Sequence, residues 1–144
     1  MRVAVSTRQL WRKLSNGKSL FLIAGPCVIE SEGLCLKVAR SLRATCDRLG
    51  VTYIFKASFD KANRTSGKSR RGPGLEQGLK ILKKIREKVN VPVLTDIHDE
   101  EQARAAAEVV DAIQIPAFLC RQTDLIESAA RTQAIVNLKK GQFL

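Results

Sequence analysis

Polar side chains, several of them cationic, recur at the ends of short apolar runs in this 144-residue chain. Lys56 closes one run, Asp96 and His98 follow another, Gln114 lies near the end of a third, and Lys139 follows a fourth. A single lysine at such a place is more often a rim charge than a ligand, but here four runs agree. Lysine supplies point charge to phosphate and carboxylate groups, and arginine supplies forked contacts. The pattern indicates a site for a multiply charged anion, with phosphorylated ligands among the candidates.

Five β-rich runs alternate with amphipathic stretches and would carry these side chains. We expect strands at about residues 20–24, 51–56, 91–95, 111–115 and 134–138. Helices are expected between them, at about residues 31–49, 75–89, 99–109 and 123–131. Ser31 is a suitable N-cap, and Asp99 with Gln102 three residues later resembles a capping box. Strands that alternate with helices favour parallel pairing and right-handed crossovers.

Two α/β architectures fit this order: an open doubly wound sheet and a TIM (β/α)₈ barrel. A complete barrel has ~250 residues, so five units in this length have the density of an incomplete barrel, with about the first five β-strands and four helices. In both architectures the active face lies at the carboxyl ends of the strands, where the cations fall. We divide the chain into an N-terminal extension at 1–19, where Asn16-Gly17 can turn a hairpin, and a partial barrel at 20–144.

The formal net charge of +11 makes nucleic-acid binding the usual first hypothesis. The charge is dispersed, however, because part of it lies on one helix face at 80–88 and part in a loop at 56–71 without base-stacking aromatic spacing. A small anionic substrate explains that loop at least as well, so a basic nucleic-acid-binding protein is kept as an alternative. No apolar run could span a bilayer and no signal peptide is apparent, so we expect a cytoplasmic protein.

Residues 62–69, Ala-Asn-Arg-Thr-Ser-Gly-Lys-Ser, come close to the phosphate-binding motif G-x-x-x-x-G-K-[ST], with alanine for the first glycine. In a P-loop the motif lysine leads directly into a helix whose N-terminus binds phosphate. Here Arg70-Arg71-Gly72-Pro73-Gly74 follows, and Gly-Pro-Gly breaks a helix. We therefore favour a flexible basic loop and keep a P-loop-like nucleotide-binding protein as a weaker alternative.

Six segments resemble the signatures of the 3-deoxy-D-manno-octulosonate 8-phosphate synthases. In single-letter code they are AGPCVIES from residue 24, KASFDKANR from 56, RGPGLE from 71, TDIH from 95, QIPAFLCRQTD from 114 and NLKKGQF from 137. They follow the family's order across residues 20–144. The sister 3-deoxy-heptulosonate 7-phosphate synthases share the barrel and the G-P-C turn. They typically have Lys-Pro-Arg-Thr where this chain has Lys61-Ala-Asn-Arg64, which favours the octulosonate family.

The resemblance implies an enzyme that condenses phosphoenolpyruvate with D-arabinose 5-phosphate and water, releasing phosphate. The product would feed lipopolysaccharide synthesis in Gram-negative bacteria and a cell-wall sugar in plants. The family forms homotetramers, and the resemblance implies neither nucleic acid nor membrane as a partner.

The resemblance also implies a role for each matching residue. Phosphoenolpyruvate would be held by Lys56, Lys139 and the Ala117 N–H, with Gln114 lining its pocket. Arabinose 5-phosphate would be held by Asn63, Arg64 and Thr65. Lys61 would lie between the two substrates, Asp96 would act at the subunit contact near the sugar, and Arg121 would reach the sugar phosphate of a neighbouring subunit. Lys61, Asn63 and Asp96 are the candidate catalytic residues.

At Cys27, the resemblance implies a metal cofactor. Family members with cysteine at this position use a divalent metal of the zinc, iron or manganese type, to which thiolate is a suitable ligand, and members with asparagine need none. His98 is not the family's metal histidine and is expected to orient or line the site. The remaining metal ligands of the family lie on strands after the fifth. We therefore expect this chain to supply one ligand, and to be a truncated form that is inactive alone.

Overall fold

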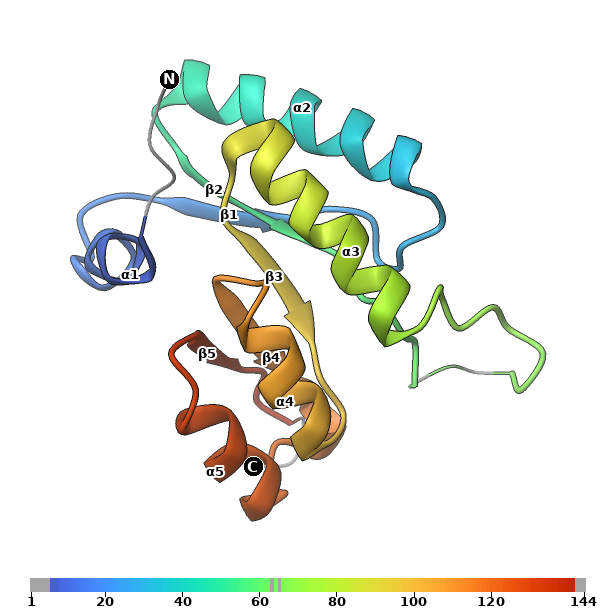
Figure 1. The fold of residues 1–144 in the computed structure, drawn as a ribbon. Coiled ribbons are helices and arrows are strands. Elements are labelled where there is room, and N and C mark those ends of the chain that lie inside the picture. The colour runs from blue at the N-terminus through green and yellow to red at the C-terminus, as the bar shows by residue number, and fades with distance from the viewer. Residues whose placement is uncertain (1–5, 63, 65, 142–144) are drawn as a thin grey trace.

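The computed structural model describes residues 6–62, 64 and 66–141, which form one five-stranded parallel sheet with helices (Figure 1). The strands are β1 (Phe21–Ala24), β2 (Thr52–Lys56), β3 (Val93–Asp96), β4 (Ala112–Ile115) and β5 (Ile135–Leu138), and they pair in sequence order. Every expected strand is present, with its bounds within two residues of the prediction. Parallel pairing in sequence order brings the carboxyl ends of all five strands to one edge of the sheet.

The helices are α1 (Thr7–Ser15), α2 (Glu32–Leu49), α3 (Leu75–Ile85), α4 (Glu100–Ala107) and α5 (Thr123–Ala130). Two shorter elements are the π-helical turn η1 (Arg86–Asn90) and the 3₁₀ turn η2 (Ala117–Leu119). The predicted caps are confirmed at two helices. The Ser31 hydroxyl accepts from the Leu34 N–H, and the Asp99 carboxylate accepts from the Gln102 N–H.

The four crossover helices cover one face of the sheet. A single apolar core contains Tyr53, Phe55, Val93, Ile113 and Ile115 from the strands together with the inward sides of α2, α3, α4 and α5. A doubly wound sheet would place helices on both faces. Helices on one face of a parallel sheet are the arrangement of a (β/α)₈ barrel, so the predicted barrel class is confirmed, with five of its strands present.

The opposite face carries α1 instead of a hairpin. The hairpin that we expected at Asn16-Gly17 was wrong, because residues 7–15 form a helix with a complete capping box between Ser6 and Gln9. The side chain of Leu10 is almost fully buried against Ile54, Leu94 and Ala112. The helix forms because Leu10 and Leu14 lie on one side of it and can cover this apolar part of the inner sheet face.

The helix expected at 75–89 is α-helical only as far as Ile85, the last residue of α3. After Ile85 the chain continues as η1, and Asn90 takes a positive φ of 54°. Arg86 binds the buried carboxylate of Asp111 through contacts of 2.8–3.2 Å, and that carboxylate also accepts from the Val93 N–H at 3.0 Å. This buried contact ties the start of β4 to the approach to β3, and so helps to set the register of the two strands that carry Asp96 and Gln114.

Candidate active site

Polar side chains form a layer on the inner face of the sheet, at the carboxyl ends of the strands. Side chains alternate between the two faces along each strand. The inner-face residues Ile54, Leu94, Ala112 and Ile135 are apolar and lie under α1. Two residues later along the same strands come Lys56, Asp96, Gln114 and Asn137. The layer is therefore produced by the pleat of the strands and the register of their pairing, and we call these four residues the polar layer.

The carboxylate of Asp96 is the centre of the polar layer. It accepts a hydrogen bond from the hydroxyl of Ser58, and Lys56 Nζ lies 2.8 Å from the Ser58 oxygen and 3.4 Å from Asp96 Oδ1. The second carboxylate oxygen lies 3.5 Å from Nε2 of His98. On the neighbouring strands, the Asn137 amide donates to the Gln114 side-chain oxygen at 3.0 Å. Four of the five predicted strand-end residues thus lie on one face at one edge, namely Lys56, Asp96, His98 and Gln114.

Asp96 is held ionised although it is buried. Burial by itself raises the pKa of the Asp96 carboxyl, but the contact with His98, the charge of Lys56 and the hydroxyl of Ser58 outweigh it and lower the pKa to about 2. The side chain of Asp96 is only 9% exposed. A fixed negative charge therefore stays beside the Lys56 ammonium and keeps that cation at the strand ends.

The basic loop after β2 is closed at its base. The Gly74 N–H donates to the Phe59 oxygen and the Lys61 N–H donates to the Arg71 oxygen. The guanidinium of Arg71 forms a forked pair with the carboxylate of Asp60, which lowers the pKa of Asp60 against the smaller opposing effect of burial. These contacts close the base of the loop that carries Lys61 and Arg64, both of which are half-buried.

Arg64 has unused hydrogen-bonding capacity. Its buried Nε finds no partner among residues 6–62, 64 and 66–141, and its Nη1 makes two contacts of 3.5 Å to the oxygens of Lys61 and Ala62. A buried guanidinium N–H without an acceptor is costly, so this donor is suited to an anionic ligand. Asn63 and Thr65, the other predicted ligands of the sugar phosphate, lie outside the described residues.

The segment after β4 forms the next part of the rim. Ala117 opens η2 and is half-buried, whereas Phe118 and Arg121 are exposed. The ring of Phe118 stacks on His98 with a centroid distance of 6.3 Å. After β5, Lys139 is exposed, and its N–H donates to the Ile115 oxygen at 3.0 Å. The structure thus brings Ala117 and Lys139 to the same rim as Lys56, while Arg121 is exposed after η2.

Comparison with known proteins gives a close match. Residues 4–144 match the DAHP synthetase I family. The chain belongs to this family.

Relatives named 2-dehydro-3-deoxyphosphooctonate aldolase share much of the sequence. That name is a synonym for the 3-deoxy-D-manno-octulosonate 8-phosphate synthases, which the sequence resembles. The relative from Koribacter versatilis is 62% identical over 129 residues, which are 90% of this chain and 46% of the relative. The relative from Fusobacterium nucleatum is 63% identical over 130 residues, which are 90% of this chain and 47% of the relative. The predicted resemblance is confirmed. The chain spans about half the length of the curated relatives that it matches.

Cys27 lies in the turn after β1, beside the segment that follows β2. Its oxygen accepts from the Ser58 N–H at 3.4 Å, and Val28 bridges to Ser58, so the turn after β1 continues beside the segment after β2. The thiol is exposed. In the described part of the chain, no three His, Cys, Asp or Glu side chains gather as a metal site would require. A thiolate is a suitable ligand for a transition-metal ion, so Cys27 is a candidate ligand around which the described residues form no closed site.

Gly25 sets the distance between that turn and the polar layer. A Cβ at this position would lie 2.0 Å from the Lys56 oxygen, so only glycine permits the observed approach. Close packing therefore requires the glycine of the G-P-C turn. Because Gly25 has no side chain, the Cys27 turn can lie directly against the end of β2.

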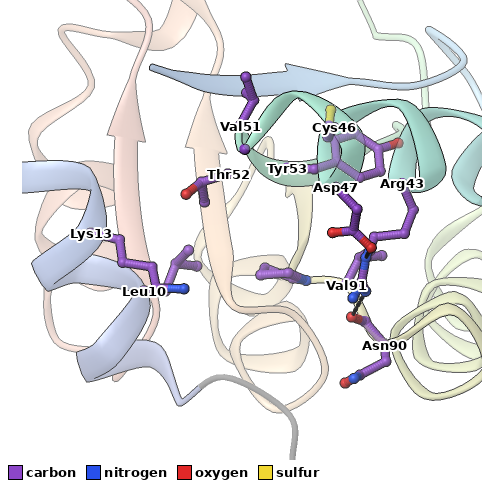
Figure 2. A pocket seen from close by; sticks show the side chains of 12 residues that line it. Leu10, Lys13, Arg43, Cys46, Asp47, Val51, Thr52, Tyr53, Asn90 and Val91 are labelled. Carbon is purple, nitrogen blue, oxygen red and sulfur yellow. Dashed lines mark hydrogen bonds and ion pairs between the residues drawn. The ribbon is translucent and has the colours of Figure 1, made fainter. Parts of the chain in front are cut away.

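A cavity of about 420 Å³ lies at the opposite, amino end of the strands (Figure 2). Leu10, Arg43, Tyr53 and Val91 are among the residues that line it. Its Arg43 is already engaged by Asp47 and by the oxygens of Val89 and Asn90. No predicted site residue lines this cavity, so we do not assign the family's chemistry to it.

The P-loop alternative does not fit the structure. Gly67 and Lys68 lie in a turn, and α3 begins only at Leu75, after an N-cap glycine without a side-chain cap. The helix that would bind phosphate directly after the motif lysine is therefore missing from its required place.

Sequence reasoning missed Ser58, Phe118 and the amide of Gln102 as members of the site. Ser58 could have been found, because it lies two residues after Lys56 and extended chain places such residues on the same face. The Phe118–His98 stack and the contact of Gln102 with His98 depend on loop conformation, for which the sequence carries no simple signal.

Acid unfolding should report the charge of Asp96. An aspartate whose pKa is lowered on folding stabilises the fold above its unfolded pKa near 4, and that contribution disappears as the pH falls from about 4 to about 2. We expect the free energy of unfolding of the wild-type chain to fall by about 2 kcal/mol more than that of Asp96→Asn over this interval. Urea unfolding at a series of pH values measures it.

Glu108→Gln is the matched control, because Glu108 is an exposed carboxylate at the end of α4. Its pH dependence should follow that of the wild type. Parallel acid unfolding of wild type and Asp96→Asn would show that Asp96 is not held ionised by its neighbours.

Proposed function

We propose that the protein condenses phosphoenolpyruvate with D-arabinose 5-phosphate and water, giving 3-deoxy-D-manno-octulosonate 8-phosphate and phosphate. The observation that carries the proposal is the polar layer, in which Lys56 is fixed beside ionised Asp96 at the rim that also bears Lys61, Arg64 and Lys139. Relatives 61–63% identical to this chain are named for the aldolase of the same product. Two phosphates and a carboxylate meeting at one place require this concentration of cations.

The chemistry assigns the residues to two tasks. In the proposed reaction, C3 of the enol attacks the aldehyde carbon, water adds at C2, and the C2–O bond to phosphate breaks. Lys56 and Lys139 would bind phosphoenolpyruvate, with the Ala117 N–H nearby and Gln114 lining the pocket. Lys61 would contact both substrates, and Arg64, with Asn63 and Thr65, would bind the sugar phosphate. The protein's main contribution would be to hold the reacting carbons together and to neutralise the anions.

Binding of phosphoenolpyruvate tests this assignment. Lys139 is exposed, so Lys139→Met should leave the fold unchanged while it removes one charged donor to the ligand. We expect the dissociation constant for phosphoenolpyruvate, measured by titration calorimetry, to rise about tenfold or more. Lys80→Met, on the exposed side of α3, is the control and should not change it.

Equal weakening by both substitutions would contradict the assignment and indicate diffuse charge attraction. Strong, salt-dependent binding of random DNA, lost to the same extent in both variants, would favour the nucleic-acid alternative. The choice of sugar substrate is tested by comparing aldose phosphates of different chain length. An eight-carbon product needs a five-carbon aldose phosphate, so a preference for a four-carbon aldose phosphate would instead indicate the heptulosonate reaction.

We also infer that Cys27 is a ligand of a divalent metal of the zinc, iron or manganese type. Its support is the exposed thiol at the rim, between the end of β1 and Ser58. When bound, such a metal would supply positive charge for polarising a substrate oxygen.

Titration with Co²⁺ tests the thiolate ligand. We expect a thiolate-to-cobalt charge-transfer absorption that is lost in Cys27→Ser and retained in Cys35→Ser, because Cys35 is fully buried in the core. Absence of the band in the wild type, or its persistence in Cys27→Ser, would contradict the proposal.

We further propose that the protein is cytoplasmic and assembles as a homotetramer in which Arg121 reaches a neighbouring subunit. The exposed position of Arg121 after η2 supports this arrangement. None of the helices that the structure describes is long and apolar enough to cross a bilayer. Sedimentation equilibrium should show a tetramer that Arg121→Ala leaves intact, since a substrate contact does not hold subunits together. A monomer at every concentration would contradict the assembly.

A further inference from the structure

The side-chain amide of Gln102 links the N-terminus of α4 to the polar layer. Its Nε2 donates to the Asp99 carboxylate at 2.6 Å, which fixes which end of the amide faces which neighbour. The amide oxygen therefore faces His98, where it accepts from the backbone N–H at 2.9 Å and lies 3.3 Å from ring Nδ1. In an ordinary capping box this oxygen would accept from the N-cap N–H; here it accepts from the residue before the N-cap.

The His98 ring is confined on its other sides as well. Phe59 meets it edge-on with an interplanar angle of 86°, and Phe118 stacks on it with an angle of 25°. Nε2 points toward Asp96 Oδ2 at 3.5 Å, and the side chain is only 12% exposed. The carboxylate of Asp96, the last residue of β3, faces the ring, and Asp60 in the segment after β2 lies within electrostatic range of it. A ring turned by 180° about its long axis would lose the contacts of both nitrogens.

We propose that Gln102 is a positioning residue that holds His98 with Nδ1 donating to its amide oxygen and Nε2 directed at Asp96. Through this contact Gln102 keeps the Asp96 carboxylate aligned with Ser58 and Lys56. The orientation of the ring stands on geometry alone, whereas its importance for turnover rests on the proposed condensation.

The simpler interpretation is that Gln102 only caps α4. The chain offers a matched case in α1, where Gln9 occupies the same helix position after the N-cap Ser6 and its side-chain oxygen accepts from the Ser6 N–H at 3.1 Å. Gln9→Met and Gln102→Met each remove the side-chain contact of the third helix residue, and only the second should change His98.

His98 is the single histidine of the chain, so its ring signals need no assignment by mutation. Two-dimensional ¹H–¹⁵N NMR of the ring reports which nitrogen carries the proton, and exchange with solvent reports how well that proton is protected. We expect Nδ1–H in the wild type and in Gln9→Met. In Gln102→Met we expect exchange of this proton to be about tenfold faster or more, with weaker Overhauser contacts between the ring and Phe118. Gln102→Glu, which retains an acceptor, should restore the signal.

Unchanged ring signals in folded Gln102→Met would overturn the proposal, as would equal changes in Gln9→Met. If Gln102→Met unfolds, Gln102→Glu decides, because a folded Glu variant without the Nδ1–H signal also contradicts it. None of these outcomes depends on turnover. Failure of the condensation and failure of the positioning role are therefore separate results.

Discussion

The buried carboxylate of Asp96 is the contact on which the site depends. It joins the ends of β2 and β3 through Lys56 and Ser58, and it joins the segment after β3 through His98. A buried charge is stable only where partners satisfy it, and one of the partners here is Lys56, which we propose as a ligand of phosphoenolpyruvate. The same interaction therefore organises the loops and holds a cation at the strand ends.

The register of the parallel strands places further polar side chains beside Asp96 and so extends this contact into the polar layer. Asp96 pairs with Gln114, and Gln114 pairs with Asn137, so three polar side chains stand in a row across three strands. The apolar residues two positions earlier on these strands pack against Leu10 of α1. They bury the part of the same face that lies toward the amino ends of the strands. The buried pair of Arg86 with Asp111 supports the arrangement from the other end, because it connects the approach to β3 with the start of β4.

Much of this could be predicted from residue types and spacing. Alternation of β-rich and amphipathic runs predicted all five strands, and the polar residues at four strand ends predicted that polar side chains gather at one edge of the sheet. The hairpin at Asn16-Gly17 was wrong because a turn signal says nothing about whether the preceding residues find an apolar surface, and Leu10 does find one. Ser58 and Gln102 were missed for a related reason: their roles arise from contacts with groups brought close by the fold, not from their own sequence neighbourhood. Asn63 and Thr65 stay predictions, because they lie outside the described residues.

The side-chain amides of Gln114 and Asn137 offer the most direct test of the central claim, that the polar layer binds the phosphorylated substrate. The Asn137 amide donates to the side-chain oxygen of Gln114 at the strand ends, so a ligand held there by Lys56 must change the surroundings of both groups. We predict that titration with phosphoenolpyruvate shifts both amide signals in ¹H–¹⁵N NMR spectra along one saturating curve. Unchanged amide signals, with shifts confined to the exposed lysines of α3, would contradict the account.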